Sequence, residues 1–151
     1  MNIEPLEHIY NKLITNRPNS TNLNYAVSNE EGECDFFSNQ GYTEMLSGLT
    51  KSYDPRHFDR LKKENNEKGS NTNIIKVTTR KLESICNELN IKHINYLSID
   101  VEGAEFDVIK SINFDTVFID VIGFENNFDD NSVEIKEYLE TKNFIVCGKT
   151  Q

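Results

Sequence analysis

The sequence has no tryptophan, only three cysteines and three prolines, and no long apolar run. A helix that spans a membrane needs about 20 consecutive apolar residues, so we expect no membrane association. Cys34, Cys86 and Cys147 lie far apart without a CxxC pair, which argues against a zinc site or a disulfide framework. The N-terminus lacks a basic patch followed by an apolar stretch. We therefore predict no signal peptide and a cytoplasmic location.

Positive charge is also scarce. The 151 residues carry 16 Lys and Arg against 25 Asp and Glu, which gives a formal net charge of −9. Binding to a nucleic-acid backbone needs a basic surface, so we predict no nucleic-acid partner, whereas a small polar substrate stays compatible with this charge. The length suits one hydrophobic core, and we expect a single domain over residues 1–151.

The first half of the chain predicts a helix and two short strands, followed by an irregular region. Apolar residues recur at helical spacing after Pro5, and the two strands that follow are expected to pair antiparallel. Residues 38–73 lack a clear period, so we predict an irregular loop region there. The expected elements are a helix that starts near Pro5 and stops at residues 16–20, strands over Leu23–Val27 and Cys34–Phe37, a short helix over Asp54–Lys63 and a mobile loop over Asn65–Asn73.

The second half alternates strands with helices. Ile94–Val101 and Val117–Phe124 are nearly continuous apolar runs, which predict strands buried on both faces. Alternation of this kind is typical of a parallel sheet with helices on its faces. The other expected elements are a strand over Ile74–Thr78, a helix capped by Thr79 with Leu82, Ile85, Cys86 and Leu89 on one face, a helix over Ala104–Ser111, a helix over Val133–Lys142 capped by Asn131 and Glu134, and a last strand over Phe144–Cys147.

Acidic and amide side chains follow the two apolar strands. Asp100 and Glu102 come after the first strand, and Glu125 and Asn126 come after the second. Ligands of open α/β sheets bind beyond the carboxyl ends of the strands, so we expect one shared crevice if the two strands are neighbours. An unpaired buried charge is costly, so Asp100 needs a partner or a ligand. Glu102 and Glu105 could instead only stabilise the start of the next helix.

The segment Tyr96–Glu105 resembles the most characteristic motif of FkbM-type methyltransferases. Further pieces follow in the family's order from about residue 3 to about residue 146, among them Ile3–Pro5, Asn24–Ser28 and Phe124–Asn127. The resemblance implies an α/β fold with a Rossmann-like class I methyltransferase sheet. It also implies an S-adenosylmethionine-dependent enzyme that methylates an oxygen of a sugar, a glycan or a small metabolite. The alternative is a non-catalytic interaction module that keeps the methyltransferase-like fold.

The resemblance also implies which residues bind the methyl donor. Glu4 matches the acid at the tip of the second core strand, which binds the ribose hydroxyls of S-adenosylmethionine. A carboxylate suits this task because it can accept hydrogen bonds from both hydroxyls. Asn24, Ala26 and Ser28 match the tip of the third strand, beside the adenine.

Asp100 matches the position nearest the transferred methyl group and the acceptor oxygen. Positioning of these atoms supplies much of the rate in such reactions, and Asp100 or Glu102 could also take the acceptor's proton. His57 lies in the irregular region that would cover the site, where it could act as a base or anchor the acceptor. Asp100, Glu125 and Asn126 also resemble the acid and acid–amide magnesium ligands of catechol-type O-methyltransferases, because all three offer the hard oxygen ligands that magnesium prefers.

One part of the family pattern is missing. A methyltransferase of this fold begins with a strand and a glycine-rich turn, and neither precedes Ile3 in this sequence. The resemblance therefore implies an N-terminally truncated sheet that lacks the first strand, its helix and most of the second strand. We expect a bare edge on strand Ile94–Ile99, through which the chain could form a homo-oligomer. We also expect this chain alone, as a fragment, to bind S-adenosylmethionine weakly or not at all.

Overall fold

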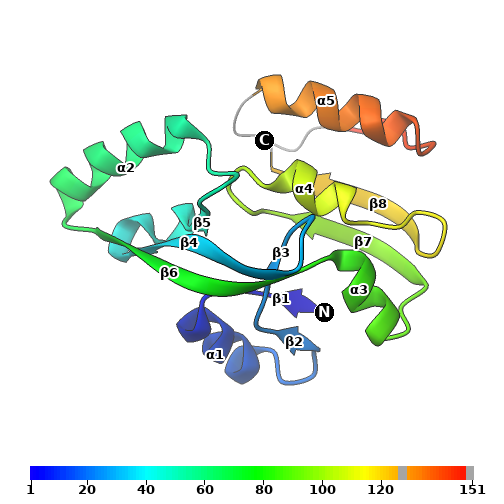
Figure 1. Ribbon diagram of the computed structural model, residues 1–151, viewed down its shortest axis with the longest axis horizontal. Coiled ribbons are helices and arrows are strands. Elements are labelled where there is room, and N and C mark those ends of the chain that lie inside the picture. The colour runs from blue at the N-terminus through cyan, green and yellow to red at the C-terminus, as the bar shows by residue number, and fades with distance from the viewer. Residues whose placement is uncertain (126–128, 149–151) are drawn as a thin grey trace.

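The computed structural model describes residues 1–125 and 129–148, which form a mixed α/β arrangement around a curled sheet (Figure 1). The strands are β1 (Asn2–Ile3), β2 (Asn22–Leu23), β3 (Ala26–Val27), β4 (Gly32–Gln40), β5 (Gly48–Leu49), β6 (Asn71–Arg80), β7 (His93–Ile99) and β8 (Phe118–Phe124). The helices are α1 (Glu7–Asn16), the 3-10 helix η1 (Gly41–Leu46), α2 (Pro55–Lys68), α3 (Leu82–Glu88), α4 (Glu105–Lys110) and α5 (Asp129–Glu140).

The N-terminal segment forms a small parallel pair, β1 and β2, joined by α1. The helix expected after Pro5 is confirmed, and it is anchored by Leu6, which is buried just before its first turn. The strand expected over Leu23–Val27 is divided instead: β2 pairs with β1, and β3 pairs with β6 in another sheet. Asn24 lies at the division, and its side-chain amide donates 2.9 Å hydrogen bonds to the carbonyls of Glu4 and Pro5.

The central sheet has the order β3-β6-β4-β5, and its long antiparallel pair is β4 with β6. The partner expected for Cys34–Phe37 is therefore wrong, because β4 pairs with β6 and β5 rather than with the strand before it. The irregular region expected over residues 38–73 is also wrong, since it contains the end of β4, η1, β5, α2 and the start of β6. Most of the paired residues at the start of β6 are exposed and polar, so they leave no apolar alternation in the sequence.

Helix α2 and η1 lie at the end of this sheet where β4 ends and β6 begins (Figure 1). Few residues of α2 are apolar, which is why only part of it, Asp54–Lys63, was predictable. Its apolar side chains pack into a separate small core, whose members are Phe37, Leu46, Tyr53, Phe58 and Leu61. The mobile loop expected over Asn65–Asn73 reduces to the short connection between Lys68 and Asn71.

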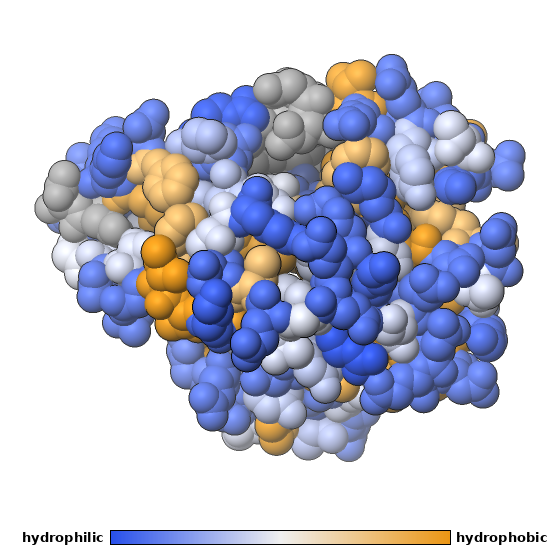
Figure 2. Space-filling view, in the orientation of Figure 1, coloured by the Kyte–Doolittle hydropathy of each residue, from blue (hydrophilic) through white to orange (hydrophobic). Residues whose placement is uncertain are grey.

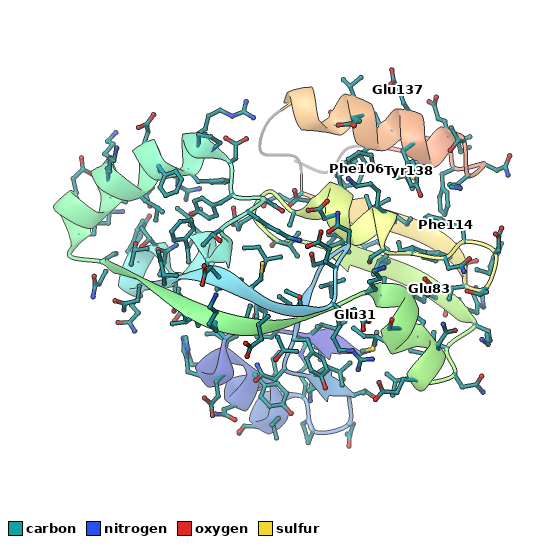
Figure 3. All side chains as sticks on the ribbon, in the orientation of Figure 1. Glu31, Glu83, Phe106, Phe114, Glu137 and Tyr138 are labelled. Carbon is teal, nitrogen blue, oxygen red and sulfur yellow. The ribbon has the colours of Figure 1, made fainter. Side chains whose placement is uncertain are left out.

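The C-terminal half contains the parallel pair β7 and β8, connected through α4. Helices α4 and α5 lie together on this pair (Figure 1), and the rings of Phe106 and Phe114 meet Tyr138 between them (Figure 3). The expectation of two strands buried on both faces is wrong: Tyr96 is 62% exposed and Phe118 is 66% exposed. No other strand pairs with these two among the described residues, so their apolar side chains stay partly uncovered.

Two expected helix caps also differ. Thr79 lies inside β6, and α3 begins instead where Ser111, at the end of α4, accepts a 3.1 Å hydrogen bond from the N–H of Leu82. Asn131 lies within α5, which begins at Asp129, so it is not the N-cap. Both helices therefore begin at positions that were not evident from their local sequence.

The strand expected over Phe144–Cys147 is absent from the structure, although the sequence there is apolar and β-branched. Phe144 packs against the core, but Ile145 is 86% exposed. A strand needs a neighbour with which to form a ladder, and no described strand lies alongside this segment. No helix of the described residues is long and apolar enough to cross a membrane.

Candidate active site

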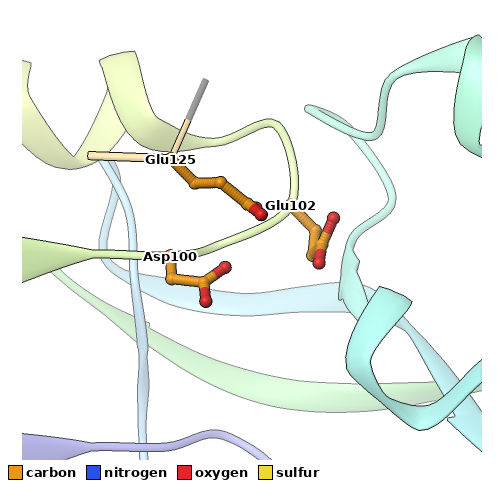
Figure 4. Close-up of side chains that lie close together, drawn as sticks. All are labelled: Asp100, Glu102 and Glu125. Atoms are coloured by element: carbon orange, nitrogen blue, oxygen red, sulfur yellow. The ribbon is translucent and has the colours of Figure 1, made fainter. Parts of the chain in front are cut away.

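The ends of β7 and β8 bring three carboxylates together. The N–H of Glu125 donates a 3.0 Å hydrogen bond to the carbonyl of Ile99, which keeps the two strand ends adjacent. The side chains of Asp100, Glu102 and Glu125 lie close together (Figure 4), and one oxygen from each lies within 4.8 Å of the others. The structure therefore confirms that the ends of the two strands lie next to each other, as the sequence predicts.

The loop that carries these acids has an unusual backbone. Glu102 adopts φ +53° and Gly103 adopts φ +108°, two successive residues in the left-handed half of the map. Non-glycine residues rarely adopt such angles, and they cluster at functional sites when they do. The loop is held by the Glu105 carboxylate, which accepts hydrogen bonds from the N–H groups of Gly103 and Val101, and by Ala104, which is buried in the core. Glu105 therefore has a structural role at the start of α4, as the sequence allowed.

Glu102 is the most perturbed acid of the cluster. Its residue surface is only 8% exposed, and burial together with the negative charges of Glu125, Asp100 and Glu105 raises its pKa to about 8. Burial and like charges both disfavour a carboxylate. A proton on Glu102 can therefore be gained or lost close to neutral pH.

His57 lies beside one acid of the cluster, Glu102. It lies in the first turn of α2 and is 3% exposed, and its Nε2 atom lies 3.5 Å from the Oε2 atom of Glu102. Burial lowers the pKa of His57, and the Asp54 carboxylate opposes that effect. We expected His57 to lie in an irregular region that covers the site. The structure does place it there, but on a regular helix.

Two glycines allow this close packing. A Cβ atom at Gly103 would lie 2.7 Å from the carbonyl oxygen of Ser52 and 3.3 Å from the nitrogen of Asp54. A Cβ atom at Gly48 would lie 3.1 Å from the ring of Tyr53. Burial raises the pKa of Tyr53 to about 12, so its hydroxyl keeps its proton and donates to the carbonyl of Leu46 at 2.6 Å. The segment before α2 therefore packs directly on the acid-bearing loop.

The four residues expected to bind the methyl donor divide into two pairs. Glu4 and Asn24 lie side by side at the tips of β1 and β2, and one Glu4 carboxylate oxygen accepts the N–H of Leu6 at 2.8 Å. Burial raises the pKa of Glu4. Ala26 and Ser28 are buried, at 5% and 0% exposed, so their side chains present no surface to a ligand. Binding of the methyl donor by these four residues stays a prediction.

The magnesium ligands expected at Asp100, Glu125 and Asn126 are only partly placed. Asp100 and Glu125 converge, Glu102 joins them, and Asn126 lies outside the described residues. Magnesium binding at this cluster stays a prediction.

The sequence does not predict the role of one residue near the acid cluster. Asp107, on α4, accepts hydrogen bonds from the side chains of Ser52 and Asn29, which lie 55 and 78 residues before it. Contacts over such separations leave no local pattern, so only the folded chain reveals them.

Comparison with known proteins identifies the family of this chain. The family model described as the methyltransferase FkbM domain matches residues 1–146. A protein of Beauveria bassiana (strain ARSEF 2860) named Methyltransferase 1 is 29% identical over 114 residues, which cover 70% of this chain and 41% of that protein. The chain thus spans about two fifths of the length of this relative. No solved structure matches. The motif, the convergent acids and the family match together show that the chain belongs to the FkbM methyltransferase domain family.

Proposed function

We propose that this domain transfers the methyl group of S-adenosylmethionine to a hydroxyl oxygen of a sugar, a glycan or a small metabolite. The observation that carries the proposal is the cluster of Asp100, Glu102 and Glu125 at the strand ends, in which Glu102 has a pKa of about 8. A general base works best when its pKa lies near the working pH. Glu102 meets this condition and follows the carboxyl end of the parallel strand β7, the edge at which open α/β sheets bind their ligands.

In the proposed reaction the acceptor oxygen forms a bond to the methyl carbon while the bond between that carbon and sulfur breaks. The electron pair of the broken bond stays on sulfur, and the acceptor's hydroxyl proton moves to the ionised Glu102 carboxylate. Asp100 accepts a hydrogen bond from the acceptor and fixes its orientation. S-adenosylmethionine supplies an electrophilic methyl group, and Glu4 would hold its ribose.

We assign the acceptor side to η1 and α2. His57 reaches Glu102 from α2, and Figure 2 shows a group of apolar side chains in the region where α2 and η1 lie in Figure 1. Tyr42 and Met45 of η1 are 50% and 61% exposed. Tyr42 contacts Lys68 and Met45 contacts Arg60, so both lie against α2, and such exposed apolar surface suits the ring face of a sugar or a metabolite.

The test is methyl transfer from labelled S-adenosylmethionine to a panel of monosaccharides, glycans and small hydroxylated metabolites. We expect the rate of the wild-type protein to rise with pH through about 8, because Glu102 must lose its proton. Asp100→Asn and Glu102→Gln should each lower the rate at least about 100-fold, the usual contribution of a general base. Glu102→Gln should also remove the rise near pH 8.

The matched control is Asp120→Asn. Asp120 is an exposed carboxylate of β8 that hydrogen-bonds to His93 and Asn95, so its loss should leave methyl transfer unchanged. Transfer that survives both Asp100→Asn and Glu102→Gln would refute the assigned roles. Absence of transfer to every acceptor would refute transfer by this chain alone, and it would fit either the weak binding of S-adenosylmethionine expected of this chain or the non-catalytic interaction module.

A further inference from the structure

Asp107 binds two segments that are distant in the sequence. Its Oδ2 atom accepts a 2.8 Å hydrogen bond from the hydroxyl of Ser52, and its Oδ1 atom accepts a 2.8 Å hydrogen bond from the side-chain amide of Asn29. Lys110 lies 3.3 Å from the same Oδ1 atom, three residues along α4. One partly buried carboxylate thus has both oxygens engaged by different loops.

The Ser52 segment leads to the proposed acceptor side. Ser52 and Asp54 lie against Gly103 so closely that a side chain there would collide with them. Asp54 is followed at once by α2, whose first turn carries His57 to Glu102. A small shift of this segment would therefore move His57 relative to Glu102.

The Asn29 segment follows the tip of β3, where the family resemblance places the adenine of the methyl donor. Asn29 follows Ser28 directly after β3, and it lines a polar hollow of about 610 Å³ in front of α3. The side-chain amide oxygen of Asn29 also accepts a 3.3 Å hydrogen bond from Lys51, whose ammonium group donates to the Glu30 carboxylate as well. The residues that line the hollow are Asn29, Glu30, Glu31, Lys81, Glu83 and Ser84, and Figure 3 labels Glu31 and Glu83.

We propose that Asp107 is a positioning residue, which fixes the loop after β3 and the segment before α2 on the helix that follows the acid-bearing loop. The proposal rests on the proposed function, because the two segments lie beside the donor and acceptor sides that this function requires. The contact with Lys110 does not account for this arrangement, since an exposed ion pair within one helix contributes little. The hydrogen bonds to a charged group are the stronger interactions.

The first experiment measures hydrogen exchange in the isolated chain, so that it does not depend on methyl transfer. Asp107→Ala should accelerate exchange at least about 10-fold in both residues 28–31 and residues 50–57, because a tenfold change corresponds to one lost interaction of ordinary strength. Ser52→Ala should accelerate only the second segment, and Asn29→Ala should accelerate the first more than the second, because Asn29 also accepts a hydrogen bond from the exposed Lys51 ammonium group. Asp115→Ala, at an exposed acid in the turn after α4, is the matched control and should change neither.

The second experiment exchanges the two partners. Asn29→Asp places two carboxylates against each other and should accelerate exchange in residues 28–31. Adding Asp107→Asn should restore protection, because the new amide can donate to the new carboxylate while its carbonyl still accepts from Ser52. This double variant also keeps the test valid if Asp107→Ala does not fold.

The third readout is the ring resonance of His57 in an NMR spectrum, which is accessible because the chain has three histidines. Asp107→Ala and Ser52→Ala should shift this resonance, and Asn29→Ala should not. Unchanged exchange in one of the two segments with Asp107→Ala, failure of the double variant to restore protection, or an unmoved His57 resonance would each overturn the proposal. None of these outcomes bears on whether the domain transfers methyl groups.

Discussion

Glu102 combines a left-handed backbone with a buried carboxyl group that has a pKa of about 8. In the unfolded chain its pKa is near the ordinary value of 4.5. The folded state therefore binds the proton more tightly. The resulting stabilisation is complete below about pH 4.5, and it is lost as the pH rises through about 8.

Glu102→Gln should remove this pH dependence, because glutamine stays neutral. We expect the variant to match the wild type near pH 5 and to be more stable at pH 9, by on the order of 2 kcal/mol. Urea unfolding at several pH values in the presence of EDTA measures the difference. Glu137→Gln, at an exposed position of α5, should follow the wild type throughout, and a Glu102→Gln curve parallel to the wild type would contradict the prediction.

Gly103 is constrained both by its backbone and by its neighbours. Gly103→Ala should destabilise the fold by about 2–4 kcal/mol, because it adds a collision with Ser52 to a strained φ. Gly32→Ala is the control, since Gly32 has φ +134° but nothing within 4 Å of an added Cβ. Equal losses for the two variants in urea unfolding would show that the contact with Ser52 adds nothing.

The three converging carboxylates also predict an effect of divalent cations. Magnesium bound by Asp100, Glu102 and Glu125 would neutralise their mutual repulsion and stabilise the folded state by mass action. We expect magnesium chloride at ten times its Kd to raise stability by about 1.4 kcal/mol, seen as a higher Tm. Asp100→Asn should abolish the increase, and EDTA should reverse it; a Tm indifferent to magnesium would refute a metal role.

At the scale of elements, α2 and η1 depend on their own small core rather than on an amphipathic pattern. Leu61 is 4% exposed within that core. Leu61→Ala should cost about 2–5 kcal/mol, the usual range for a buried leucine. It should also loosen the turn that carries His57, which hydrogen exchange of α2 would report.

Val133→Ala is the control for this change, because Val133 is 54% exposed on α5. It should alter stability by less than about 0.5 kcal/mol, as is normal for a surface site. A Leu61→Ala loss that does not exceed the Val133→Ala loss would show that the small core is not cooperative with the fold.

At the scale of the whole molecule, the uncovered part of β7 and β8 predicts self-association. Tyr96 and Val121 are partners across the pair, and they are 62% and 41% exposed. Uncovered strands with apolar side chains favour pairing with another chain. We expect the isolated chain to form concentration-dependent oligomers, measured by size-exclusion chromatography with light scattering.

Tyr96→Lys should shift the chain toward the monomer, because it places a charge at this surface. Tyr42→Lys is the matched control, since Tyr42 is exposed on η1 and is remote from the strand pair in the sequence. A chain that stays monomeric at all concentrations, or oligomers that respond equally to both changes, would contradict a role of this surface.

The sequence by itself determined the alternation of strands and helices in the second half, and the place of Asp100, Glu102 and Glu125 at strand ends. These features are local, because periodicity and strand termini are properties of a few adjacent residues. It also carried the family motif, which the match over residues 1–146 bears out.

Only the tertiary structure decided the rest. The polar start of β6, before the strand expected over Ile74–Thr78, is extended because β4 pairs with it, and α2 is held by a core assembled from η1, β4 and α2 itself. The meeting of His57 with Glu102, and of Asp107 with Ser52 and Asn29, joins residues more than 40 positions apart. Such contacts depend on packing between elements, so the stretches of sequence that form them contain no sign of each other.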